Sequence, residues 1–273
     1  MKKFLSLLVA FGMVAALTAC AGGADSTASD STDSDSTASE STASEATTEA
    51  AEADTTGTVL THEEYMAADV DTQVTIETYV QAKQSWWEDK ATVYAQSEDG
   101  AYFLYDMACS EEDYEKLTPG TCIRVTGYKA EWSGEIEIME GTFEFVEGAD
   151  TFVAEPLDVT DLLGSEELID HQNELVSFKG LTVEPSTVEG SDEEYAFLYN
   201  WDGSGADGDD LYFNASYNGE TYTFTIESYL CDNTTDVYNA VEALEVGQTI
   251  DMEGFLYWYE GVNPHITSVT VAG

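Results

Sequence analysis

"GTCIRVTGY", residues 120–128, returns later in the chain as "GQTIDMEGF", residues 247–255. In both stretches a glycine opens an alternating run of apolar and polar residues, which ends at a second glycine followed by an aromatic residue. Alternation with a period of two is typical of a β-strand with one buried face. We infer that one β-rich unit is present twice in the chain.

The segments that precede these two stretches also match in type and order. In each half, two strand-like runs meet at a turn signal, "EDG" at residues 98–100 and "NG" at residues 218–219, and such signals are typical of β-hairpins. A short helix is then predicted, capped by Ser110 in the first half and lying within residues 234–247 in the second. Each unit therefore has the order strand, strand, strand, helix, strand, strand.

This order resembles that of the OB-fold, a five-stranded barrel with a helix between strands three and four. The resemblance implies a mainly β protein with two tandem OB-fold-like barrels, one in residues 58–150 and one in residues 151–273. In front of the first barrel, Thr61 and Glu64 have the spacing of a helix capping box. Two β-sandwiches or two SH3-like barrels are the alternatives, and the position of the helix favours the OB-fold.

Residues 1–20, "MKKFLSLLVAFGMVAALTAC", have the pattern of a secretory signal peptide. Their apolar run is too short to span a bilayer comfortably. The final "LTAC" resembles the lipobox of bacterial lipoproteins, which implies that Cys20 is lipidated and becomes the mature N-terminus. The protein would then be anchored by lipid at the extracytoplasmic face of the bacterial cell membrane. An ordinary cleaved signal peptide with an incidental cysteine is the alternative.

Residues 21–57 are rich in Ser, Thr, Ala, Asp and Glu and contain no aromatic or branched aliphatic residue. Such a segment cannot bury enough apolar surface to fold, so we predict a disordered acidic tether. Signal, tether and barrels together resemble the uncharacterised surface lipoproteins of Clostridia-type bacteria. That family offers no known activity to transfer to this chain.

The charge of the chain is strongly negative. Eight Lys and Arg residues stand against 55 Asp and Glu residues, which gives a formal net charge of −47. Such a surface is expected to repel phosphate backbones and anionic lipid headgroups. The composition therefore predicts no nucleic-acid partner and no docking on the membrane surface other than through the lipid. It favours cations, cationic partners or neutral ligands.

Residues 254–261, "GFLYWYEG", carry four aromatic side chains, and their counterpart is "GYKAEWSG" at residues 127–134. Unbroken alternation in the counterpart would bury Lys129, and burying an unpaired charge is costly. The pattern therefore predicts that the buried face switches at the first glycine of each stretch. Most of the aromatic rings would then enter the core, and Trp258 would face outward.

The OB-fold resemblance implies where a ligand would bind. Proteins of this fold use the loops after strand one and between strands four and five, beside the face of strands two and three. Those loops hold the candidate ligand-binding residues Trp86, Trp87, Trp132 and Trp258. An exposed flat ring suits the apolar face of a sugar, or a prolyl or aromatic side chain. Packing of these rings into the barrel ends is the alternative.

The stretch "DGSGADGDD", residues 202–210, offers carboxylates on a glycine-rich backbone. Calcium is bound by six to eight carboxylate and carbonyl oxygens, so the stretch is a candidate calcium site, and no other cofactor is expected. The candidate ligands are Asp202, Asp207, Asp209 and Asp210. A solvated acidic loop is the alternative.

Cys109 and Cys122 flank a short acidic segment, and an exported chain could join them in a disulfide. Cys231 has no such counterpart and is expected to be a buried free thiol. An anaerobic producer would leave the first two cysteines reduced as well.

Catalysis finds little support in the sequence. The three histidines have no metal-ligand spacing, and no nucleophile motif or phosphate-binding glycine loop is present. We therefore expect a non-catalytic surface lipoprotein that binds an extracellular glycan or peptide through OB-fold loops. The alternatives are a structural or adaptor subunit of an envelope protein complex and, less favoured, an enzyme with an unrecognised carboxylate site.

Overall fold

The computed structural model describes residues 57–272, which belong to one compact unit. The signal peptide, the lipidation residue Cys20 and almost all of the tether lie outside the described residues, so these predictions stay untested. Within residues 57–272, no helix has the length and apolar character needed to cross a membrane.

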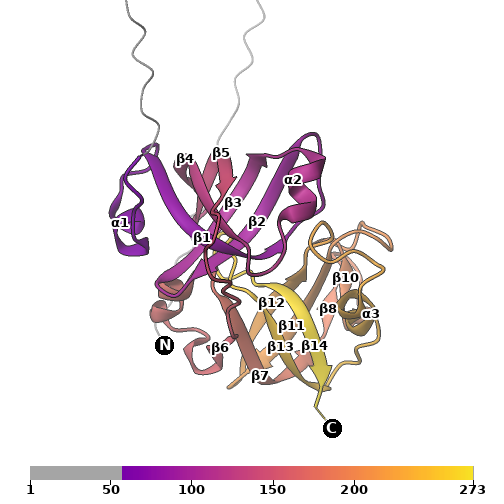
Figure 1. The fold of residues 1–273 in the computed structure, drawn as a ribbon. Coiled ribbons are helices and arrows are strands. Elements are labelled where there is room, and N and C mark those ends of the chain that lie inside the picture. The colour runs from indigo at the N-terminus through magenta and orange to yellow at the C-terminus, as the bar shows by residue number, and fades with distance from the viewer. Residues whose placement is uncertain (1–56, 273) are drawn as a thin grey trace, which may run out of the picture. The chain divides into compact units, whose positions relative to one another are not determined.

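The first barrel follows helix α1 (His62–Ala67) and closes in the order β1-β2-β3-β5-β4 (Figure 1). Helix α2 (Glu111–Lys116) lies between its third and fourth strands. The parallel pairing of β3 with β5 completes the barrel. Its strands are β1 (Gln73–Lys83), β2 (Lys90–Ser97), β3 (Gly100–Ala108), β4 (Cys122–Trp132) and β5 (Glu135–Phe145).

The second barrel repeats this topology. Its strands are β7 (Leu175–Glu184), β11 (Leu211–Tyr217), β12 (Glu220–Ile226), β13 (Thr249–Phe255) and β14 (His265–Val271). Strand β11 pairs with both β12 and β7, and β12 pairs in parallel with β14, so the sheet closes. Helix α3 (Asp236–Glu242) again lies between strands three and four. The predicted fold of two tandem OB-fold-like barrels is confirmed.

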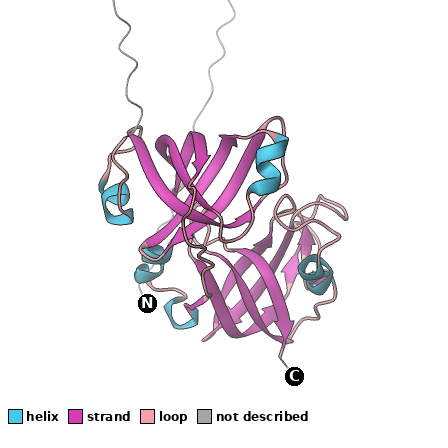
Figure 2. Cartoon of the chain, viewed as in Figure 1, coloured by secondary structure: helices cyan, strands magenta, loops and turns pink. Residues whose placement is uncertain are grey.

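Short strands and 3-10 helices lie between the barrels in sequence and within the second barrel (Figure 2). Before the second barrel come β6 and two 3-10 helices, and the long segment between β7 and β11 forms three short strands. Their bounds are β6 (Leu157–Asp158), η1 (Thr160–Leu162), η2 (Glu166–His171), β8 (Ser186–Thr187), β9 (Glu194–Tyr195) and β10 (Leu198–Tyr199).

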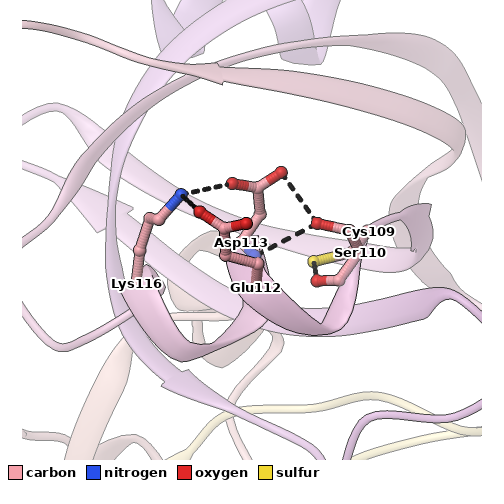
Figure 3. A network of polar contacts seen from close by, with 5 residues as sticks. All are labelled: Cys109, Ser110, Glu112, Asp113 and Lys116. Carbon is pink, nitrogen blue, oxygen red and sulfur yellow. Dashed lines mark hydrogen bonds and ion pairs between the residues drawn. The ribbon is translucent and has the colours of Figure 1, made fainter.

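Local sequence signals account for several of these boundaries. Thr61 and Glu64 form the predicted capping box at α1, so two otherwise unpaired backbone amides gain partners. At α2, the Ser110 hydroxyl accepts a hydrogen bond from the Asp113 amide at 3.2 Å, as Figure 3 shows. Lys116 at the other end of α2 donates to the Asp113 carboxylate.

Each barrel has its own apolar core, and a third cluster joins them. The first core includes Ile76 and Leu104, and the second includes Phe178 and Phe224. The third cluster consists of Tyr94 and Phe103 from the outer face of the first barrel and Phe255 from the second. The rings of Tyr94 and Phe255 stack with centroids 4.5 Å apart.

The predicted switch of the buried face does not occur in the first barrel. Lys129 is only 4% exposed, so the alternation continues past Gly127. Its Nζ donates to the backbone oxygens of Met66 and Ala68 at the end of α1, at 2.7 and 2.8 Å. The prediction was wrong because these carbonyls, distant in sequence, satisfy the buried ammonium group.

The second barrel shows the same continuity. Leu256 enters the barrel core, whereas Phe255 points away from it into the cluster between the barrels. Gly254 allows close contact between strands, since a Cβ at this position would lie 2.3 Å from the backbone oxygen of His265. The glycine therefore allows the backbones of β13 and β14 to come close together at a bulge in their pairing.

Candidate ligand-binding cleft between the two barrels

The two barrels are held together by hydrogen bonds as well as by the aromatic cluster. The Ser85 amide donates to the backbone oxygen of Tyr229 at 2.7 Å, and the Leu175 amide donates to the Gln96 side chain at 2.8 Å. These contacts connect the loop after β1 and strand β2 with the second barrel. They fix the walls of the cavity that lies between the barrels.

That cavity has a volume of about 1040 Å³, at the upper end of the range for small-molecule sites. Aromatic rings from both barrels dominate its walls. They belong to Trp87, Phe103, Tyr105, Trp201, Tyr212, Tyr229, Tyr257 and Tyr259. We call this cavity the inter-barrel cleft.

The cleft lies on the part of the first barrel that OB-folds use for ligands. Its walls include Thr92 of β2 and Phe103 of β3, which belong to strands two and three, and Trp87 of the loop after strand one. The second barrel contributes the loop between its strands four and five, residues 256–264. One cleft thus combines the expected ligand face of one barrel with the expected ligand loop of the other.

A tight turn presents Trp87. Glu88 and Asp89 both have left-handed backbone conformations, with φ of 47° and 61°. Trp87 and Lys90 exchange backbone hydrogen bonds across them, at 3.3 and 2.9 Å. Two successive residues with positive φ are typical of a type I′ hairpin turn. The Trp87 side chain remains 66% exposed at the mouth of the cleft.

The most exposed ring in the wall from the second barrel is that of Trp201, at 76%. It lies in the turn after β10, where the Gly203 amide donates to the Asn200 backbone oxygen at 3.2 Å. Tyr229 and Tyr259 add further exposed rings from the segments after β12 and before β14. Flat, exposed rings therefore face the cleft from both barrels.

Charged groups in the cleft are mainly acidic. Among the lining residues of the described chain, Lys90 is the single Lys or Arg, and its Nζ lies 2.9 Å from an Asp106 carboxylate oxygen. Burial, helped by the nearby Asp210 carboxylate, raises the pKa of Glu227 to about 7. Backbone amides of Tyr229 and Leu230 donate to the Glu227 carboxylate. The cleft thus has little free positive charge.

The floor of the cleft contains His265, the first residue of β14. Burial alone lowers the pKa of His265 to about 3, so the imidazole is neutral. Its Nδ1 lies 2.6 Å from the Tyr94 hydroxyl. The ring of Tyr257 stacks on the imidazole with centroids 4.3 Å apart.

Of the four predicted tryptophans, the structure places only Trp87 in the cleft. Trp86 is half-buried, and its Nε1 donates to the backbone oxygen of Cys109 at 2.9 Å. Trp132 is 59% exposed at the tip of the β4–β5 hairpin and does not line the cleft. Trp258 is half-buried against the same hairpin and does not line the cleft.

Sequence reasoning missed most of the residues in the second wall. Trp201 stands directly before the stretch weighed only as a calcium site, and an exposed tryptophan beside glycines was a usable signal. Glu227, Tyr229 and Asn263 had no comparable signal. They reach the cleft only because the two barrels dock.

The candidate calcium ligands do not come together. Within residues 57–272, no group of three or more Asp, Glu, His or Cys side chains is arranged to hold a metal ion. Two of the carboxylates accept hydrogen bonds from backbone amides within the stretch: Asp202 from Ser204 and Asp209 from Ala206. The other two accept from residues outside it: Asp207 from the Asn233 side chain and Asp210 from Ser228. Each carboxylate accepts from a donor of its own, and the described structure does not gather the four as the calcium-site prediction requires.

The candidate disulfide is likewise not formed. Cys109, Cys122 and Cys231 are buried free thiols. The Cys109 thiol contacts the backbone oxygen of Ser110 at the start of α2 (Figure 3), whereas Cys122 lies beside Tyr79. Burial raises the pKa of Cys109 and Cys231 to about 11, so both thiols are protonated at neutral pH.

The fold and the cleft define an OB-fold protein with two fused barrels. No protein-family model and no curated protein matches the chain. Similar solved structures include a murine DNA-binding protein bound to double-stranded DNA, with 12% identity over 73% of this chain and 96% of that one and a TM-score of 0.34. The Ifi202 HINa domain in complex with double-stranded DNA has 14% identity over 74% and 96%, with a TM-score of 0.32. A replication protein A heterotrimer bound to single-stranded DNA has 12% identity over 74% and 49%, with a TM-score of 0.30.

These structures correct one prediction. The chain's negative charge predicted no nucleic-acid partner, and this exclusion is wrong as stated, because proteins of similar fold were solved bound to DNA. The formal charge is a sum over the whole chain and does not describe a single binding surface.

Proposed function

We propose that this protein is a non-catalytic, lipid-anchored binding protein of the bacterial cell surface and that its ligand lies in the inter-barrel cleft. The observation that carries the proposal is the position of the cleft. A cavity lined by exposed aromatic rings coincides with the strand face and loops through which OB-folds bind ligands.

The chemistry of the walls favours a neutral glycan as the ligand. The apolar face of a sugar ring packs on an aromatic side chain, and Trp87 and Trp201 offer such faces from opposite barrels. Between them, the amides of Gln84 and Asn263 and the carboxyl of Glu227 can form hydrogen bonds with hydroxyl groups. A neutral glycan also meets no repulsion from the acidic protein.

Glycan arrays, followed by calorimetry with the glycans that bind, test this proposal on the mature chain. Trp87→Ala and Trp201→Ala are each expected to weaken binding roughly tenfold or more, because each removes a stacking surface. Trp132→Ala is the matched control, since this ring is also more than half exposed but does not line the cleft. Unchanged glycan affinity in both cleft variants overturns the site.

Oligonucleotides and peptides are screened on arrays in the same way. Binding of either class without any glycan overturns the proposed ligand, and the cleft variants then show whether the site itself still holds. A partner that binds equally well to all three tryptophan variants would favour the adaptor function.

The surface location rests on the signal peptide and lipobox at residues 1–20. Detergent phase partitioning of the expressed protein tests it. The native chain is expected in the detergent phase and the Cys20→Ala chain in the aqueous phase. Equal partitioning of the two chains would remove the lipid anchor from the proposal.

A further inference from the structure

Three side chains form a hydrogen-bonded series that leads to the floor of the cleft. Gln84 Nε2 lies 3.2 Å from the Tyr94 hydroxyl, and that hydroxyl lies 2.6 Å from His265 Nδ1. Tyr94 and His265 are both buried, at 0% and 6% exposure. Gln84 and Tyr94 belong to the first barrel and His265 to the second, so the series crosses between them.

The chemistry of these groups fixes the direction of each hydrogen bond. The Gln84 amide nitrogen can only donate, so the Tyr94 oxygen accepts from it. Tyr94 has one proton left to place, and His265 Nδ1 is its other hydrogen-bond partner within the described chain. A buried hydroxyl that left its proton unpaired would incur a substantial free-energy cost. Tyr94 therefore donates to Nδ1, which must be unprotonated.

A neutral imidazole carries one proton, so this proton is placed on Nε2. The imidazole is held neutral because it is buried among rings. Tyr257 stacks on one face, and the Tyr94 ring meets it edge-on with centroids 5.9 Å apart. His265 lines the cleft, and Nε2 has no partner within residues 57–272.

We propose that His265 is a specificity-determining residue of the inter-barrel cleft: its Nε2–H, fixed by the series Gln84–Tyr94–His265, donates a hydrogen bond to an oxygen of the ligand. The ligand then presents an acceptor oxygen at the floor, between the Trp87 and Trp201 walls. A sugar hydroxyl or ring oxygen meets this requirement. The ligand class rests on the proposed function, whereas the protonation state of His265 does not.

Nitrogen NMR of the ligand-free chain tests the protonation state directly. We expect a neutral His265 with the proton on Nε2 from pH 5 to pH 8. Tyr94→Phe removes the hydroxyl but keeps the ring, and it is expected to leave a mixture of the two neutral tautomers. A proton on Nδ1 in the native chain, or an imidazolium at pH 5 to 6, overturns the proposal.

Calorimetry with the tightest-binding glycan tests the role in recognition. His265→Phe keeps a flat ring without a donor, and we expect it to weaken binding about tenfold to a hundredfold. His265→Gln keeps an N–H donor and is expected to stay within about fivefold of the native affinity. Melting temperatures of all variants show whether the fold is retained.

The outcomes separate the two proposals. Native affinity in a folded His265→Phe variant overturns the role of His265, while the cleft remains the site. If no glycan binds the native chain but the Nε2 proton is observed, the proposed ligand fails and the donor is retained. If Tyr94→Phe changes neither the tautomer nor the affinity, the three-residue series is overturned.

Discussion

Residues 127–134 and 254–261 occupy corresponding places in the two barrels and end in different surroundings. In the first barrel, Ser133 and Gly134 form a tight turn with φ of 51° and 96°, and Trp132 beside them faces water. In the second barrel the strands separate earlier, and a longer loop carries Tyr257 and Tyr259 to the cleft. The same glycine-framed pattern therefore gives an exposed hairpin tip in one barrel and part of the cleft wall in the other.

The two copies also contact each other. The Glu260 amide donates to the Ser133 backbone oxygen at 2.8 Å, and the Trp258 amide donates to the Glu135 carboxylate at 2.9 Å. A Cβ on Gly134 would lie 2.8 Å from the Trp258 ring, so the tryptophan packs directly on that turn. Corresponding hairpins of the two barrels therefore form both sides of one interface, and the loop that carries Tyr259 of the second barrel also lines the cleft.

The largest effect is expected at the aromatic residue that follows the first glycine of each stretch. Phe255 is buried between the barrels, whereas its counterpart Tyr128 is 41% exposed. Phe255→Ala should lower the free energy of unfolding by about 3 kcal/mol or more, because it leaves a cavity beside Tyr94 and Phe103. Tyr128→Ala should cost less than about 1 kcal/mol. Urea unfolding of both variants checks this, and equal losses would contradict the assigned difference.

A second prediction concerns the carboxyl that joins the two copies. Burial raises the pKa of Glu135 to about 8 from its ordinary value of 4.5. Between these values the folded chain retains a proton that the unfolded chain releases. The contribution of Glu135 to the free energy of unfolding therefore falls as the pH rises from about 4.5 to about 8, by roughly 1 kcal/mol per pH unit.

Glu135→Gln removes this titration. The amide oxygen can still accept from the Trp258 amide, and the side chain no longer carries a charge that burial disfavours. We expect the variant to gain stability relative to the native chain as the pH rises towards 8. Unfolding measured at several pH values checks this, with the exposed neighbour Glu131→Gln as control. A native pH slope in Glu135→Gln would contradict the assignment.

The differences between the copies also show where sequence reasoning ends. Strand alternation, the Ser110 cap and the Asn218 turn depend on neighbours in sequence, and these features are as predicted. The burial of Lys129 depends on carbonyls at the end of α1, which no local pattern reveals. Residues such as Glu227 enter the cleft only when two separate barrels dock, so the sequence could indicate the loops but not the opposite wall.

A smaller effect is expected for ligand binding at the tips of the two copies. Tyr259 lines the cleft, whereas Trp132 at the other tip does not. Tyr259→Ala should weaken glycan binding roughly fivefold to tenfold through lost ring contact. Trp132→Ala should leave the affinity unchanged, although it removes a larger side chain. Calorimetry on both variants measures these affinities. A larger loss of affinity in Trp132→Ala than in Tyr259→Ala would indicate that the glycan binds at the hairpin tip.

The smallest effect is expected at the turn that presents Trp87. The turn at Ser133–Gly134 has glycine at its second position, whereas the turn after Trp87 places Asp89 there with φ of 61°. Asp89→Gly relieves the left-handed strain but makes the unfolded chain more flexible, so a net gain of about 0.5 kcal/mol is expected. Glu98→Gly is the control, because Glu98 lies in the β2–β3 turn without a positive φ. At this position glycine relieves no strain and only makes the unfolded chain more flexible, so the free energy of unfolding should fall. If both glycine variants lose stability equally in urea, the turn after Trp87 carries no backbone strain.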